Sequence, residues 1–191
     1  RELERQFDLS ALRDYTVEAG RTDTITAEKL RVLRDHGADR VSVNPQTMED
    51  PVLEAIGRRH TAREILEALD KVRKVGGMAV NMDLIAGLPS DTVFGFQRSL
   101  ETVLALEPEN ITVHTLSMKR GSGLARDSRA VPSPSAVGEM LSFAYPRLRE
   151  SGYAPYYLYR QKNMSGGFEN TGWTKKGHEN LYNVCMMEEL C

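Results

Sequence analysis

The chain has 191 residues, enough for one domain with a sizeable buried core. It is 40% hydrophobic and 27% charged, as globular proteins usually are, and its net charge of −2 gives no basic signature, so we expect no nucleic-acid partner. No segment approaches the about 18 consecutive apolar residues of a membrane-spanning helix, and two cysteines make no disulfide framework, so we expect a cytoplasmic protein.

Segments that favour β-strands alternate with helical segments over most of the chain. The predicted strands are Tyr15–Glu18, Arg40–Gln46, Met78–Leu88 and Asn110–Met118. Between them, helices are predicted from about Thr26 to Gly37, over Pro51–Ile56, from a capping box at Thr61 and Glu64 to Gly76, and from about Ser90 to a point before Pro108. This alternation, with short connections, predicts right-handed crossovers and a parallel sheet.

The rest of the chain follows a different pattern. A helix is predicted from about Ser135, and Pro146 is expected to kink or split it. The tyrosine-rich segment Tyr153–Arg160 is predicted to be an edge strand because it contains Pro155, while glycines 166, 167 and 172 mark loops. We therefore expect a barrel unit over residues 1–152 and a C-terminal extension over 153–191. Both ends look cut, so we expect a fragment of a longer protein.

All four predicted strands place polar side chains on a face that packing would normally make apolar. Strand residues alternate between faces, so Asn81 and Asp83 lie opposite Val80, Met82 and Leu84. The polar residues on the other strands are Glu18, Ser42, Asn44, Gln46, Thr112 and His114. A buried aspartate is costly unless it is paired or faces a hydrated space. The pattern predicts a polar pocket built from adjacent strands.

Each candidate residue also has a structural explanation. Asp83 can be a carboxylate that accepts backbone amides, Gln46 a turn cap, and Glu18 a solvated strand end. Residues 58–60 (Arg-Arg-His) form either a solvated basic turn or an anion site, and His114 is more often a satisfied core histidine than a ligand. The sequence has no GxGxxG or GxxxxGK[ST] loop. The pattern alone therefore does not decide between an open sheet and a barrel with functional residues at its strand ends.

Five sequence motifs occur in an order and spacing that are characteristic when taken together: Tyr15–Gly20, Arg40–Met48, Ile56–Thr61, Asn81–Pro89 and Tyr156–Met164. Together they resemble the radical S-adenosylmethionine branch of the oxygen-independent coproporphyrinogen III oxidases, and in particular its coproporphyrinogen dehydrogenase subgroup. The resemblance implies an α/β fold, a partial (βα) barrel of parallel strands flanked by helices, here truncated and followed by a mixed C-terminal extension. It also implies an iron–sulfur enzyme of haem biosynthesis.

The resemblance also implies cofactors, partners and site residues. The cofactors are S-adenosylmethionine and a [4Fe–4S] cluster, which together drive oxidative decarboxylation of coproporphyrinogen III propionates to vinyl groups. The partners are a porphyrinogen substrate and an electron donor such as flavodoxin or ferredoxin. Glu18 matches the glutamate that contacts the amino acid end of S-adenosylmethionine, and Gln46, Arg58 and Asp83 match its other binding residues.

One departure from the family is large. The cluster of the family is held by three cysteines in a CxxxCxxC loop, whereas this chain has only Cys185 and Cys191. We expect that loop to lie upstream of Arg1, this chain alone to be inactive, and S-adenosylmethionine to bind weakly. We assign no catalytic residue and no metal ligand.

Two other functions remain open. Related chains are haem chaperones, for which His114, His178 and Cys185 are the candidate iron ligands. A metal-dependent barrel hydrolase would instead use Glu18, Asp83 and His114.

Overall fold

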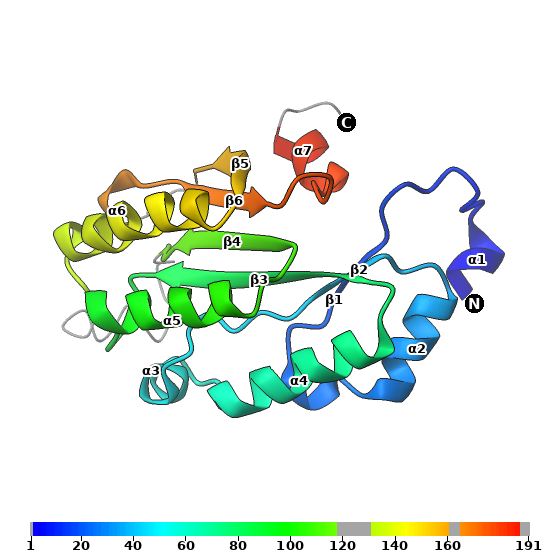
Figure 1. The fold of residues 1–191 in the computed structure, drawn as a ribbon, viewed down its shortest axis with the longest axis horizontal. Coiled ribbons are helices and arrows are strands. Elements are labelled where there is room, and N and C mark those ends of the chain that lie inside the picture. Colours follow the sequence, from blue (N-terminus) through cyan, green and yellow to red (C-terminus); the bar gives the residue numbers. More distant parts are fainter. Residues whose placement is uncertain (1, 118–130, 161–164, 188–191) are drawn as a thin grey trace.

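The computed structural model describes residues 2–117, 131–160 and 165–187. Six strands form one sheet in the order β1-β2-β3-β4-β6-β5 (Figure 1). The first four strands pair in parallel, and β6 and β5 add antiparallel pairs. They are β1 (Thr16–Glu18), β2 (Arg40–Ser42), β3 (Ala79–Ala86), β4 (Asn110–Thr115), β5 (Ala154–Tyr159) and β6 (Asn170–Thr174). The predicted α/β class with a parallel sheet and a mixed C-terminal part is confirmed, and β5 is the predicted edge strand.

The helices lie between and after these strands. Those of the parallel part are α1 (Glu2–Gln6), η1 (Thr22–Thr24), α2 (Ala27–Asp35), α3 (Asp50–Ala55), α4 (Ala62–Val75) and α5 (Val93–Ala105). The later ones are α6 (Pro134–Glu150), η4 (Ser165–Gly167) and α7 (Leu181–Met187). Within the described ranges, no helix has the length and apolar content needed to cross a bilayer.

Helix starts follow the chemistry of the capping residues. The Thr61 side chain accepts the Glu64 backbone N–H, and the Glu64 carboxylate accepts the Thr61 N–H at 2.7 Å, which is the predicted capping box. Thr26 caps α2 in the same manner. The α5 cap is Thr92, which accepts the Gly95 N–H, so α5 begins slightly later than predicted. These local bonds fix the helices that cover one face of the sheet.

The core lies between that face and the helices. On β3, Val80, Met82, Leu84 and Ala86 are at most 3% exposed, while the alternate residues, including Asn81 and Asp83, are half-buried. The predicted alternation is therefore confirmed, and the polar face of the sheet points away from the helices. The boundary predicted at residue 152 stays a prediction, although β6 pairs directly with β4.

Helix α6 runs through Pro146 without interruption, so of the predicted kink or split the split is wrong. Buried side chains on both sides of the proline, among them Val137 and Leu148, pack into the core and offset one lost hydrogen bond. Gly172 is not in a loop but in the middle of β6, where the Tyr157 ring occupies the space of a side chain. The predicted strand end at Met118, the end of the tail string at 161–164 and Cys191 lie outside the described residues.

Candidate functional site

Polar side chains from four strands meet in one row across the sheet. The pairing register places Glu18 beside Ser42, Ser42 beside Asn81, and Asn81 beside Asn110. Neighbouring strands are about 4.8 Å apart, so these side chains form a continuous strip on the face opposite the helices. The next polar row begins with Asp83, which lies beside Thr112.

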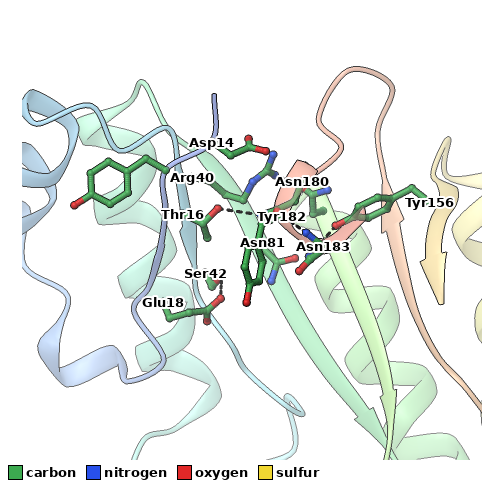
Figure 2. Close-up of a pocket in the computed structure, with 12 residues that line it drawn as sticks. Asp14, Thr16, Glu18, Arg40, Ser42, Asn81, Tyr156, Asn180, Tyr182 and Asn183 are labelled. Carbon is green, nitrogen blue, oxygen red and sulfur yellow. Dashed lines mark hydrogen bonds between the residues drawn. The ribbon is translucent and has the colours of Figure 1, made fainter. Parts of the chain in front are cut away.

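This strip forms the floor of a cavity of about 350 Å³ (Figure 2). The side chains that the strands supply are Thr16, Glu18, Arg40, Ser42, Asn81 and Asn110, and those that close it from the C-terminal segments are Tyr156, Asn180, Tyr182 and Asn183. Asn180 Nδ2 joins the two groups by donating to Thr16 Oγ1 at 2.9 Å, and within the C-terminal group Asn183 Nδ2 donates to Tyr156 Oη at 3.3 Å. The cavity is thus a polar space whose walls come from both ends of the chain.

Glu18 is the last residue of β1 and faces this cavity. Its carboxylate accepts hydrogen bonds from Ser42 Oγ at 2.9 Å and from Asn44 Nδ2 at 3.1 Å. Both donors are neutral, and the Glu18 side chain is exposed, so its negative charge remains available to a cation. A carboxylate that is oriented but not neutralised suits an ammonium group.

Gln46 is held against Asp83 by the backbone. The Gln46 N–H donates to the Asp83 carbonyl, and the Ile85 N–H donates to the Gln46 carbonyl, each at 2.9 Å. Gln46 is 9% exposed and has φ of +67°, a left-handed conformation that non-glycine residues adopt only where their surroundings enforce it. The structure therefore brings Gln46, four residues beyond the end of β2, against Asp83 on β3.

Asp83 sits within a chain of polar contacts. Its Oδ1 accepts a hydrogen bond from Asn81 Nδ2 at 2.9 Å, and its Oδ2 lies 3.6 Å from His114 Nε2. The other ring nitrogen of His114, Nδ1, lies 3.5 Å from the Tyr159 hydroxyl. With polar partners near both nitrogens, His114 fits the prediction of a satisfied histidine better than that of an iron ligand.

Arg58 lies apart from the other three predicted residues. It donates to the Gly20 carbonyl at 3.3 Å, two residues after Glu18, but its side chain lines a second cavity of about 540 Å³. Arg21, Arg59 and His60 line the same cavity, together with two carboxylates, those of Asp23 and Glu64. Burial, followed by the Arg58 charge, lowers the pKa of His60, so the positive charge of this cavity comes from its arginines. It can hold an anion beside the carboxyl end of β1.

The tyrosines of β5 reach the polar face through a bulge. Pro155 lies opposite Trp173 and Tyr157 opposite Gly172, so Tyr156 is an extra residue and its side chain reaches the cavity. The Tyr157 ring lies over Gly172, where any Cβ would overlap it, and its hydroxyl is 3.3 Å from Thr112 Oγ1. Tyr157 thus packs the edge strand against β6, while Tyr156 forms part of the cavity wall.

Several cavity residues were not identified from the sequence, among them Arg40, Asn110 and Asn180. Arg40 lies two residues before Ser42, so strand alternation could have placed it on the polar face. Asn110, the first residue of β4, could have been found in the same way. No sequence signal places Asn180, because its position depends on the contact with Thr16, 164 residues away.

The comparisons with known proteins agree with this geometry. The model of the Radical SAM superfamily matches residues 3–103, more than half of the chain. The chain belongs to the radical SAM superfamily. It is 47% identical to the oxygen-independent coproporphyrinogen-III oxidase-like protein HemZ of Bacillus subtilis, over 99% of this chain and 38% of HemZ. It is 28% identical to the heme chaperone HemW of the same organism, over 87% of this chain and 45% of HemW.

The comparison with solved structures shows the same fold. The coproporphyrinogen III oxidase HemN of Escherichia coli, a radical SAM enzyme, superposes with a TM-score of 0.77 at 23% identity, over 97% of this chain and 40% of HemN. This likeness confirms a partial radical SAM barrel, and the family model together with the identity to HemZ confirms the resemblance to the family of HemN, HemZ and HemW. The chain spans less than half the length of these relatives.

The residues of this chain are suited to one of the two cofactors of radical SAM proteins and not to the other. S-adenosylmethionine carries an ammonium, a carboxylate and two ribose hydroxyls, for which Glu18, Arg58 and Asp83 are suitable partners. A [4Fe–4S] cluster needs thiolates, and this chain has two cysteines with no CxxxCxxC spacing, so its residues do not fit the cluster.

The hydrolase alternative finds no support in the geometry. Across residues 2–117, 131–160 and 165–187, no group of three or more histidine, cysteine, aspartate or glutamate side chains is arranged to hold a metal ion. Glu18, Asp83 and His114 thus share a face of the sheet without converging on one point.

Proposed function

We propose that this chain supplies the S-adenosylmethionine-binding residues of a radical SAM oxidoreductase that converts coproporphyrinogen III propionates to vinyl groups in haem biosynthesis. The observation that carries the proposal is that Glu18 on β1 and Asp83 on β3 share one polar face on either side of β2, and that Gln46, which follows β2, is hydrogen-bonded to the backbone of Asp83. The 47% identity to the oxidase-like protein HemZ supports the choice of reaction. The substrate is a proposal for the whole protein.

Each residue has a role that its surroundings support. Glu18, oriented by Ser42 and Asn44, binds the ammonium of the methionine moiety. Arg58 binds the methionine carboxylate, because a guanidinium offers paired donors to two oxygens. Asp83 accepts hydrogen bonds from the ribose hydroxyls, and Gln46 is fixed next to it with an amide that both donates and accepts.

When bound with its cluster, S-adenosylmethionine supplies the hydrogen-atom abstraction that starts oxidative decarboxylation. The residues of this chain do not fit the cluster, so the part of this chain in the reaction is to bind and orient S-adenosylmethionine and the substrate. In the whole protein, a small redox protein such as flavodoxin or ferredoxin would be the electron donor.

Calorimetric titration of the chain with S-adenosylmethionine tests the proposal. We expect binding weaker than micromolar, and a further loss of about tenfold in Glu18→Gln and in Asp83→Asn, since each removes a charge-assisted hydrogen bond. Asp70→Asn is the matched control, because Asp70 is exposed and pairs only with Lys74 within α4 among the described residues. Sub-micromolar binding, or equal affinities in all variants, would contradict the assignment.

Haem binding is the second candidate, favoured by the similarity to HemW and by the exposed position of His178 after β6. A haem titration distinguishes a haem chaperone from the proposed oxidoreductase. A haem chaperone should give a Soret band that weakens in His178→Ala or Cys185→Ala, whereas the proposed oxidoreductase should bind coproporphyrin III with no dependence on either residue.

A further inference from the structure

Arg40 is a buried cation for which the described residues supply no ion pair. It is the first residue of β2, is 5% exposed and lines the 350 Å³ cavity. Its guanidinium donates to Asn110 Oδ1 and, at 3.0 Å, to the His178 carbonyl, both of which are neutral. Its Nε is buried with no hydrogen-bond partner, and no carboxylate in the described part of the chain forms an ion pair with it.

The surroundings hold this guanidinium in one orientation. Asn110 accepts from Arg40 through Oδ1 and donates through Nδ2 to the same His178 carbonyl at 2.8 Å, so the three groups form a closed triangle. A buried charge is strongly unfavourable unless it is paired, and an arginine fork presents up to five donors. Two of these donors are used, and those that remain suit a planar anion.

Two carboxylates line the same cavity, but no ion pair is found between either of them and Arg40 among the described residues. Asp14 Oδ2 accepts the Leu181 N–H at 2.6 Å, and Glu18 is bound by Ser42 and Asn44. Tyr156 lies within range of the Arg40 charge: burial raises the pKa of this tyrosine, and Arg40 opposes that rise. The hydroxyl of Tyr156 therefore remains protonated at neutral pH and can donate a hydrogen bond next to Arg40.

We propose that Arg40, together with Tyr156, forms a binding subsite for the carboxylate group of an organic ligand. This rests on the proposed function, under which the ligand is a propionate side chain of the tetrapyrrole. Arg40 precedes Ser42 by two strand residues, and Ser42 lies beside Glu18, so the subsite lies about 7 Å along the strands from the cofactor end. A substrate with several propionates can occupy it with one carboxylate while another approaches the cofactor.

The carboxylate that binds Arg40 could also be that of the methionine moiety of S-adenosylmethionine. A pair of variants distinguishes this carboxylate from a propionate of the tetrapyrrole. Coproporphyrin III, its tetraamide and S-adenosylmethionine are titrated into the wild-type chain, Arg40→Gln and Arg58→Gln. We expect Arg40→Gln to weaken coproporphyrin III binding about 10- to 100-fold and to leave S-adenosylmethionine binding unchanged, with the reverse in Arg58→Gln. The tetraamide should bind the wild-type chain as weakly as coproporphyrin III binds Arg40→Gln.

A second measurement requires neither porphyrin nor a stable variant. The Arg40 Nε–H signal in a nitrogen-15 spectrum of the wild-type chain is followed while sodium propionate is added, with sodium chloride as the control. A saturable shift with propionate but not with chloride supports the subsite, and no shift overturns it.

The two experiments together separate the subsite from the proposed function. If propionate shifts the signal but coproporphyrin III does not bind, the carboxylate subsite is supported and the proposed substrate is wrong. If Arg40→Gln weakens only S-adenosylmethionine binding, the ligand carboxylate belongs to the cofactor and the inference about the substrate is overturned.

Discussion

The most quantitative prediction concerns Asp91, in the connection between β3 and α5. Asp91 is 7% exposed; its Oδ1 accepts the Thr92 N–H at 2.8 Å, and its Oδ2 is buried without a partner in the described structure. Burial raises the pKa of this carboxyl from 3.8 to about 6, and the nearby Glu49 charge adds to the rise. The folded protein therefore holds a proton on Asp91 more strongly than the unfolded chain does.

The sign and size of the effect follow from linkage. Because the folded pKa lies above the unfolded value, the folded state binds more protons between about pH 4 and pH 6, so the stability due to protonation is complete below about pH 4 and is lost as the pH rises through 6. A shift of about two pKa units corresponds to about 3 kcal/mol in the free energy of unfolding. Asp91→Asn has the same shape without the charge, and should recover about 1–3 kcal/mol at neutral pH.

Urea unfolding of both proteins at a series of pH values measures this. The wild-type free energy of unfolding should fall from about pH 4 to about pH 7 relative to that of Asp91→Asn, and the two should converge at the acid end. Asp70→Asn is the control for removing a carboxylate that is exposed. Parallel pH profiles for the wild type and Asp91→Asn would refute the reasoning, because they would mean that Asp91 titrates alike in the folded and unfolded states.

Three further predictions follow from single contacts. Gly172→Ala should lower the free energy of unfolding by about 1–3 kcal/mol in denaturant titrations, because the new methyl group overlaps the Tyr157 ring, and the loss should shrink when Tyr157→Ala is also present. Thr61→Ala removes the cap of α4 and should cost about 1 kcal/mol in the same assay; no change would mean that the capping box does not hold the helix start. After anaerobic incubation with iron and sulfide, the chain should show neither a stoichiometric [4Fe–4S] spectrum nor cleavage of S-adenosylmethionine, since Cys185 and Cys191 cannot supply three thiolates.

Much of the site could be predicted because its residues lie at strand positions that alternation determines. The two faces of β3 follow from the order of Val80, Asn81, Met82 and Asp83, whose side chains must alternate. Glu18 is placed at the cavity by the same rule applied to β1. The family resemblance named Arg58, but its placement in a neighbouring cavity depends on the path of the chain between α3 and α4.

The sequence alone determined the features that depend on near neighbours: the parallel order of strands and helices, the alternation on β3 and the cap at Thr61. Only the tertiary structure decided the contacts that depend on register across the sheet. Arg40 meets Asn110 and His178 from 70 and 138 residues away, and Gly172 meets Tyr157 only because β5 bulges by one residue. Local hydrogen bonds and periodicity operate over a few residues, whereas a buried charge or a close ring contact exists only once distant strands have paired.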